Sequence, residues 1–307
     1  MVSTRTALGL VALMSLGACS EHTQTGPALP DPKFVVQGAE TGDRLRNVGV
    51  MVYRNPGDPT WYYWDCSGSL IAKRAFLTAS HCLIGGLNPF QYGIADFGVA
   101  FPAHLIDTGD PFNPKLPDDE PVYRGTVVLY PGAEQNKPED FATEAEWLEF
   151  PDLAVVVLDR PVRGLTPVEL PPVGWVEKHT GQLGRTLTAI AGYGVTNVDP
   201  FFGNPGVIDW GIRRFGTTRY SSLTPTVAFL NPEPSTACYF DSGGPAFATD
   251  ATDGQLPAKV GMQYGITRWF QEFGTDDAGR VVCAGRTGVG RLDTQAAHDF
   301  LAPFLDR

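Results

Sequence analysis

Short apolar runs separated by clusters of turn-forming residues characterise the chain from Val35 onwards. Runs of this length are typical of strands, because an amphipathic helix needs a longer pattern with a period of 3.6 residues. The 35 glycines and 26 prolines supply the turns between them. Together these features predict an all-β barrel or sandwich. The clearest strand candidates are SGSLIAKRAFLTAS (67–80), GTVVLY (125–130), LAVVVL (153–158), TLTAIAGYG (186–194) and AKVGMQYGI (258–266).

One helix is expected, at the C-terminal end of the chain. Asp293 or Thr294 can cap it, and Pro303 limits its regularity. The apolar positions that this helix would bury are Ala297, Phe300, Leu301 and Phe304. No other convincing long helix is expected, which leaves His179 in a polar loop.

Two further stretches stand apart from the strand pattern. The segment from Ala133 to Phe150 is strongly acidic, with only Lys137 in opposition. It is either a solvated surface insertion or a segment that repels acidic substrates. The aromatic stretch from Trp61 to Trp64 is either an ordinary strand or hairpin, since aromatic residues are good strand formers, or an adhesive surface patch.

The first residues are a targeting segment. Arg5 gives a positive start, and the apolar run at 7–18 is too short to span a bilayer. The run ends in LGAC at Cys19, which is similar to a bacterial lipobox, where the cysteine carries lipid and becomes the new N-terminus. We therefore predict lipidation of Cys19, with an ordinary secretory signal cleaved nearby as the alternative. Both predict export, either anchored in the bacterial cell envelope or released to the periplasm or extracellular space.

Lipidation also resolves the odd number of cysteines. If Cys19 carries lipid, four cysteines remain, one pair in each half of the chain, in a compartment that permits disulfides. They are Cys66 and Cys82, then Cys238 and Cys283. The polar, proline-rich stretch that follows Cys19 reads as a tether.

Charge and ligand patterns narrow the partners. The formal net charge of −11 argues against a nucleic-acid partner and favours a soluble acidic surface. No clustered metal-ligand pattern occurs, so neither a metal nor another cofactor is expected. The expected partners are a peptide or protein substrate and, through lipid on Cys19, a membrane.

The stretch CYFDSGGP, from Cys238 to Pro245, reads as a loop that presents Ser242. A serine becomes a nucleophile only beside a positioned base, which a carboxylate orients in turn. Among the five histidines, His81 differs by its context, at the end of the strand AFLTAS and next to Cys82. The other four are His22, His104, His179 and His298.

Five segments in order resemble the chymotrypsin-like (trypsin-like) serine peptidases. They match the histidine region with its cysteine spacing, the aspartate segment, the turn that opens the second barrel, the nucleophile loop and the specificity-pocket strand. These segments are 66–82, 152–162, 191–194, 238–245 and 283–290. The resemblance implies two packed six-stranded antiparallel β-barrels with a C-terminal helix, and the disulfides Cys66–Cys82 and Cys238–Cys283.

On this resemblance the chain divides into three parts. They are a signal peptide at 1–18, a lipidated N-terminus with tether or propeptide at 19–34, and a serine peptidase domain at 35–307. Within the domain, the first barrel is expected at about 35–165, the second at about 166–290 and the helix at about 294–307.

The resemblance implies a role for each catalytic residue. Ser242 would be the nucleophile, and His81 the general base and then the acid that protonates the leaving amine. Asp152 would fix the imidazole tautomer and stabilise its charged form. Asp140 and Asp159 are weaker candidates for the carboxylate.

An oxyanion hole and an activation contact follow in the same way. The backbone N–H groups of Phe240 and Ser242 would form the oxyanion hole, although the family usually has glycine where this chain has Phe240. In relatives, a freed amino terminus pairs with the aspartate before the nucleophile. Here Val35 would pair with Asp241, although the nearest basic residue, Lys33, stands one position early.

The implied specificity pocket has Thr236 at its floor and two glycines, Gly265 and Gly288, on its walls. Gln263 takes the place of the family's usual buried serine. The full set of expected substrate-binding residues is Thr236, Ala237, Gln263, Tyr264, Gly265 and Gly288. A floor without a carboxylate leaves a bound Lys or Arg charge unpaired, which is costly when buried.

The resemblance therefore implies an exported, lipid-anchored serine endopeptidase made as a zymogen. It would form an acyl-enzyme and prefer large apolar or aromatic residues before the scissile bond. Two alternatives remain: a catalytically weak or inactive relative that acts as a peptide- or protein-binding module, and an ester-specific hydrolase. An α/β-hydrolase is excluded, because Ser242 lacks a glycine two residues before it and the order here is His, Asp, Ser.

Overall fold

The computed structural model describes residues 38–54, 61–84, 97–106, 115–135, 144–196, 210–252, 257, 259–275 and 281–306. The predictions for the signal peptide, Cys19, the tether and the Val35 amino terminus lie outside these residues. Within the described parts of the chain, no helix has both the length and the apolar character needed to cross a membrane.

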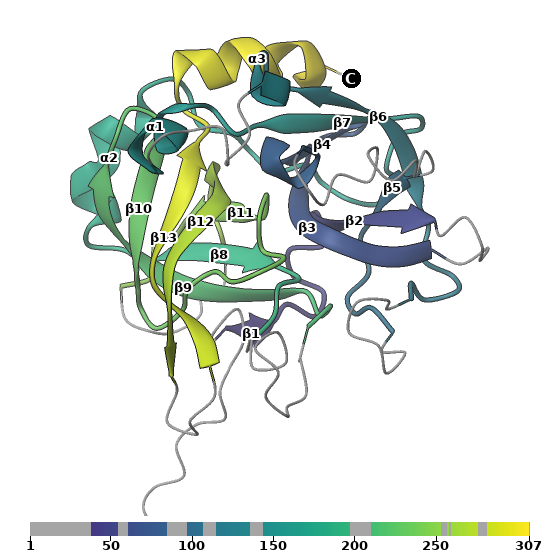
Figure 1. Ribbon diagram of the computed structural model, residues 1–307, viewed down its shortest axis with the longest axis horizontal. Helices are drawn as coiled ribbons and strands as arrows, with labels where there is room; N and C mark the ends of the chain where they lie inside the picture. The colour runs from purple at the N-terminus through teal and green to yellow at the C-terminus, as the bar shows by residue number, and fades with distance from the viewer. Residues whose placement is uncertain are drawn as a thin grey trace, which may run out of the picture. The chain divides into compact units, whose positions relative to one another are not determined.

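The first half of the chain forms a closed barrel of antiparallel strands (Figure 1). Going round the barrel, the strands are β2 (Val48–Arg54), β3 (Trp61–Ala72), β4 (Ala75–Thr78), β7 (Ala154–Leu158), β6 (Tyr123–Leu129) and β5 (Phe97–Ala100). The aromatic stretch beginning at Trp61 is the start of β3, so it belongs to an ordinary strand. All four residues of β4 are buried, because this short strand lies between β3 and β7.

The second half forms another closed ring of six strands, since β8 pairs with both β11 and β9. Its strands are β8 (Thr188–Gly192), β9 (Arg214–Leu223), β10 (Val227–Pro232), β13 (Val281–Arg291), β12 (Gln263–Thr275) and β11 (Pro245–Ala248). These two barrels confirm the predicted fold class. One boundary differs: β1 (Ala39–Glu40) comes from the part assigned to the first barrel, yet it pairs with β9 of the second.

The C-terminal helix is α3 (Gln295–Leu305), and Thr294 caps it by accepting a hydrogen bond from the Ala297 N–H. Of the four residues expected to be buried there, Phe300 is only partly buried. Asp293 caps a different helix, α2 (Trp175–Leu183), by accepting a hydrogen bond from the Val176 N–H.

Two short helices were not predicted, α1 (Glu144–Glu149) and α2. His179 therefore lies on α2, and its assignment to a polar loop was wrong. The sequence gives little local sign of α2, because Gly174 precedes it in a left-handed conformation and its capping carboxylate is 117 residues away. One further 3₁₀ turn, η2 (Ala133–Gln135), lies in the acidic insertion ahead of α1.

Hydrogen bonds join the two barrels where β3 of the first faces the second. The Ser67 N–H donates to the Ser242 carbonyl at 2.9 Å, and the Ser69 hydroxyl donates to Gln263 Oε1 at 2.7 Å. The hydroxyl of Tyr193 donates to the carbonyl of Pro102 at 2.6 Å. This junction carries the candidate nucleophile on one side and strand β4, which leads to His81, on the other.

Candidate active site

His81 and Asp152 come from neighbouring strands of the first barrel. His81 lies in the 3₁₀ turn η1 (Ser80–Cys82) just after β4, and Asp152 lies just before β7. Because β4 and β7 are antiparallel, with Thr78 opposite Ala154, the end of one strand is next to the beginning of the other. The barrel therefore brings the two side chains together although 71 residues separate them.

Asp152 is 3% exposed and accepts hydrogen bonds on both carboxylate oxygens. Its Oδ2 is 2.6 Å from His81 Nδ1, while Oδ1 accepts from the Ser80 hydroxyl at 2.6 Å and the His81 backbone N–H at 2.8 Å. Burial alone would raise the pKa of this carboxyl. His81, followed by the Arg268 guanidinium and Ser80, outweighs burial and holds the pKa well below its usual range. With Nδ1 bonded to a carboxylate, Nε2 is the ring nitrogen that can accept a proton.

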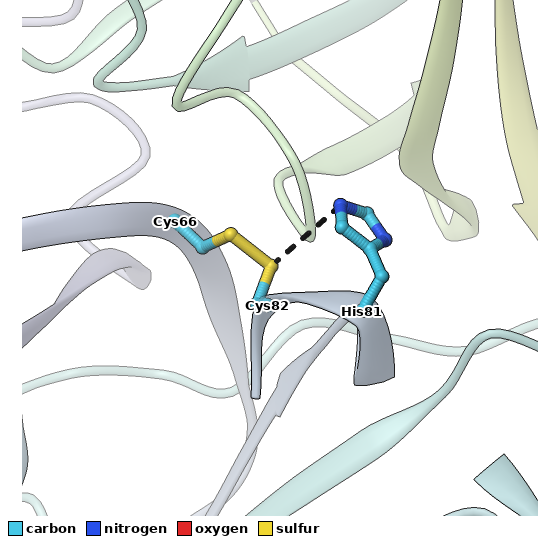
Figure 2. A group of neighbouring side chains, drawn as sticks. All are labelled: Cys66, His81 and Cys82. Atoms are coloured by element: carbon cyan, nitrogen blue, oxygen red, sulfur yellow. Dashed lines mark hydrogen bonds between the residues drawn. A yellow bond between two sulfur atoms is a disulfide. The ribbon is translucent and has the colours of Figure 1, made fainter. Parts of the chain in front are cut away.

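A disulfide lies beside the imidazole (Figure 2). Cys66 on β3 is bonded to Cys82, and His81 Nε2 is 4.0 Å from Cys82 Sγ. Cys66, His81 and Cys82 have the proximity of a metal site, but thiolates bind metals and these sulfurs are bonded to each other. The disulfide instead ties the turn that carries His81 to β3.

The nucleophile loop reaches the same place from the second barrel. The Gly243 N–H donates to the Thr267 carbonyl at 2.7 Å, and Gly243 adopts φ +78. A Cβ at Gly243 would overlap the Thr78 hydroxyl, the Ser67 carbonyl and the Ala79 nitrogen. Glycine is therefore required, and it lets the loop lie against the strand end that carries His81. Ser242, the preceding residue, is partly buried there.

Phe240 occupies the left-handed region, with φ +73. The chain thus keeps a glycine-like backbone with a phenylalanine in place, a conformation that costs of order 1–3 kcal/mol. Its carbonyl accepts from the Ser67 hydroxyl at 2.8 Å, and its ring packs against Trp210 with centroids 6.4 Å apart. These contacts hold the strained residue between the two barrels.

Asp241 is buried, with 2% exposure, and accepts from the backbone N–H groups of Gly194 at 2.9 Å and Cys238 at 3.0 Å. Burial raises the pKa of Asp241 to about 7, although these two amides and the charge of Arg214 act to lower it. The predicted pairing with the Val35 amino group lies outside the described residues.

The second disulfide, Cys238–Cys283, joins the nucleophile loop to β13, so both predicted disulfides are confirmed. Next to it, the Thr236 hydroxyl lies 3.0 Å from the Thr287 hydroxyl, which also accepts from the Ala237 N–H at 3.0 Å. Thr236 and Ala237 are therefore buried against β13, beside Gly288.

The other three predicted pocket residues lie elsewhere, and assigning them to the pocket was wrong. Gln263 is fully buried and bonded to Ser69 at the barrel junction. Tyr264 is fully buried with its hydroxyl on Thr188. Gly265 pairs within the sheet between β11 and β13.

The β12 residues opposite the pocket strand come five positions later. Trp269 pairs with Gly288 and Phe270 pairs with Thr287, while Arg268 precedes them and reaches Asp152. The sequence prediction placed the aromatic-containing segment of this long strand in the wrong register. The motif RWF at 268–270 was the available signal, because it also puts a polar residue before an aromatic one.

Comparison with known proteins supports the fold only. No family model matches the chain, and no curated protein does. Among solved structures, one of HBP matches with a TM-score of 0.55 and 14% identity over 88% of this chain and 95% of that one. A structure of human heparin binding protein matches with a TM-score of 0.54 and 15% identity over the same shares. Together with the two closed barrels, these likenesses identify the chymotrypsin-like fold.

Proposed function

We propose that this protein is a serine endopeptidase that works through an acyl-enzyme. The observation that supports it best is the 2.6 Å contact between His81 Nδ1 and Asp152 Oδ2, next to a loop that carries Ser242. A buried, ionised carboxylate on Nδ1 makes the opposite ring nitrogen a base, and a base beside a serine is the requirement for nucleophilic catalysis.

In the proposed reaction, Ser242 Oγ attacks the substrate carbonyl carbon while His81 Nε2 takes the hydroxyl proton. The imidazolium, stabilised by Asp152, then gives that proton to the leaving amine. A water molecule attacks the acyl-enzyme with His81 again as base, which releases the acid and restores Ser242. The backbone N–H groups of Phe240 and Ser242 are proposed to bind the oxyanion.

We propose that the primary specificity site lies near Thr236, Gly288 and Phe270, because Phe270 pairs with Thr287, whose hydroxyl contacts that of Thr236. A neutral floor at Thr236 disfavours Lys and Arg. The rings of Tyr239, Phe270 and Phe273 contact one another, with centroids 5.5–5.9 Å apart, and Tyr239 and Phe273 are exposed. This aromatic rim favours apolar residues before the scissile bond, in place of the glycine wall expected at Gly265.

Activation and release from the lipid anchor are proposed to be one event. The tether lies between Cys19 and Val35, so a cut that frees Val35 would also release the protein from its lipid. The new ammonium group would pair with Asp241, whose buried carboxyl has a pKa of about 7 and would ionise readily beside a cation. N-terminal sequencing and intact mass of active protein test this, and fully active protein that still carries lipid on Cys19 would overturn it.

A fluorophosphonate probe tests catalysis directly. We expect the probe to label wild type at Ser242, located by mass spectrometry of the labelled peptide, and to leave Ser242→Ala unlabelled. Peptide and ester substrates offered to the same preparation then separate an endopeptidase from an ester-specific hydrolase. A folded wild type that has been cut to begin at Val35 and is still never labelled would sink the enzyme proposal.

The second candidate function is a peptide- or protein-binding module. The strained Phe240 in the candidate oxyanion loop favours it. A binding module predicts no labelling, together with unchanged peptide binding in Ser242→Ala.

A further inference from the structure

A buried arginine lies behind the candidate triad. The Arg268 side chain is 0% exposed, and its Nε is 3.7 Å from Asp152 Oδ2, the same oxygen that contacts His81. Burying a cation is costly unless it is paired or hydrogen-bonded, so the contacts of the Arg268 guanidinium must offset that cost. The resemblance to peptidases does not give Arg268 a role, because it was not among the expected site residues.

The acidic insertion offsets part of that cost. Arg268 Nη1 donates to the Phe150 carbonyl at 2.6 Å and to the Leu148 carbonyl at 3.2 Å. These carbonyls belong to the end of α1 and the residue after it, two positions before Asp152. The guanidinium is therefore held by the end of the insertion on one side and faces the triad carboxylate on the other.

The end of the insertion is docked firmly enough to hold this position. Leu148 is buried in a cluster with Val227 and Phe229, and Trp269 packs against it. The Phe150 ring packs edge-on against Tyr130, with centroids 5.6 Å apart. The acidic insertion was expected either to be a solvated insertion or to repel acidic substrates. Its C-terminal end is instead packed against the protein beside the candidate active site.

We propose that Arg268 is a positioning residue that shares the charge of Asp152, held in place by the acidic insertion, so that His81 stays an unprotonated base at lower pH. This inference rests on the proposed triad. Asp152 stabilises the imidazolium form of His81, and a second cation on the same oxygen weakens that stabilisation. It also keeps Asp152 ionised, in agreement with the direction of its pKa.

Among the described residues, the other charged groups around Asp152 do not provide the same effect. On α1, Glu146 and Glu149 are exposed, where water screens them. On the nucleophile loop, Asp241 is turned towards Gly194 and Cys238. On β12 the charged contact with Asp152 is Arg268 itself, and on η1 it is His81.

The experiment follows the titration of His81 in wild type, Arg268→Gln and Arg268→Lys. The imidazole Hε1 resonance, assigned by its loss in His81→Ala, is measured by NMR across pH, and fluorophosphonate labelling rates are measured in parallel. We expect Gln to move both midpoints up by about one pH unit, and Lys to stay within about half a unit of wild type. Glu149→Gln is the matched control, since it removes an exposed charge one residue from Phe150, and should leave the midpoint unchanged.

Two results would overturn the inference. One is coincident titration curves for wild type and Arg268→Gln. The other is an equal shift of the His81 midpoint in Arg268→Gln and Arg268→Lys, which would mean that the shape of the side chain matters and its charge does not. If Arg268→Gln does not fold, Leu148→Ala loosens the packing of the same end of the insertion and should move the midpoint in the same direction; no movement there overturns the inference too. The NMR titration does not depend on activity. A wild type that has been cut at Val35 and titrates as expected but resists the probe therefore contradicts the proposed peptidase and leaves the role of Arg268 standing.

Discussion

Two buried aspartates, one in each half of the candidate site, behave in opposite ways. Asp152 in the first barrel is 3% exposed and Asp241 in the second is 2% exposed. Burial raises the pKa of both carboxyls, yet the pKa of Asp152 ends well below its usual range and that of Asp241 ends at about 7. Similar burial therefore leaves the two carboxyls with different pKa values, because their partners differ.

The partners differ in kind. Asp152 meets an imidazole, a guanidinium and a hydroxyl, so its charge is offset within the first barrel and by Arg268. Asp241 meets two backbone amides and the charge of Arg214, which do not outweigh its burial. The proposed base and its carboxylate are thus already in contact, whereas the loop that carries Ser242 includes a carboxyl that would gain from another cation.

The largest effects are expected from replacing the three proposed catalytic residues. We expect His81→Ala, Asp152→Asn and Ser242→Ala each to lower peptide hydrolysis by several orders of magnitude, and their effects not to add, because the three act as a unit. Steady-state kinetics and probe labelling measure this. The matched controls are Ser222→Ala and Asp250→Asn, both at exposed positions, which should keep wild-type activity. Equal turnover by wild type and Ser242→Ala would contradict the enzyme proposal.

The second prediction concerns Asp241 in protein that has not been cut at Val35. Its folded-state pKa lies above the usual value of 3.8, so its favourable contribution is complete below about pH 4 and is lost as pH rises towards 7. The lost contribution is on the order of 4 kcal/mol. Asp241→Asn should therefore flatten the fall in unfolding free energy between pH 4 and 7, as measured by urea denaturation.

The outcome for cut protein sharpens this second prediction. If the Val35 ammonium pairs with Asp241, the pH dependence of wild type should weaken after cutting, because the charged carboxyl is then stabilised. The same steep slope before and after cutting would show that no such pair forms. Asp250→Asn again serves as the control, since that carboxyl is exposed.

Local patterns carried most of what the sequence predicted about the fold. Apolar alternation and turn residues depend on near neighbours, so they predicted the strands and an all-β barrel or sandwich. The arrangement as two barrels followed from the resemblance to the serine peptidases. Local patterns do not predict the capping of α2, because its carboxylate comes from Asp293, far along the chain. The acidic composition of the insertion is visible in the sequence. Its anchoring by Arg268 is not, because it depends on contacts between distant parts of the chain.

The candidate site divides in the same way. His81, Asp152 and Ser242 lie in short motifs of fixed spacing, and the structure brings His81 to Asp152 and the Ser242 loop to the same strand end. The pocket wall was misplaced because β12 has 13 residues and two segments that fit one pattern. Only pairing with β13 decides that Trp269 and Phe270 face the pocket strand.

The third prediction tests this corrected wall. Phe270→Gly removes a ring from the position opposite Thr287, so the proposed specificity site should become deeper. We expect the ratio of kcat/KM for substrates with Phe to those with Ala before the scissile bond to rise about tenfold, or about 1.4 kcal/mol. A substrate library measures the ratio. Gly265→Ala is the control at the residue originally expected there, and a larger change in specificity from that variant would return the wall to Gly265.

The smallest expected effect concerns the strain at Phe240, the feature that most separates the second half of the site from the first. Phe240→Gly and Phe240→Ala remove the same ring from Trp210, and they differ in whether a Cβ remains at φ +73. A Cβ in the left-handed region costs about 1–2 kcal/mol, whereas glycine costs about 0.4–1 kcal/mol through the freedom of the unfolded chain. The Gly variant should therefore be the more stable by about 1 kcal/mol in urea denaturation.

The sign of that difference is informative, because at an ordinary φ the Ala variant would be the more stable one. Labelling rates add a functional measurement: if the backbone conformation at residue 240 serves the oxyanion hole, the Gly variant should keep or exceed the wild-type rate. An Ala variant that is both more stable and faster would contradict the left-handed conformation at this residue. The loop would then owe its shape to the hydrogen bond from Ser67 and to the two glycines after Ser242, with the ring of Phe240 as packing alone.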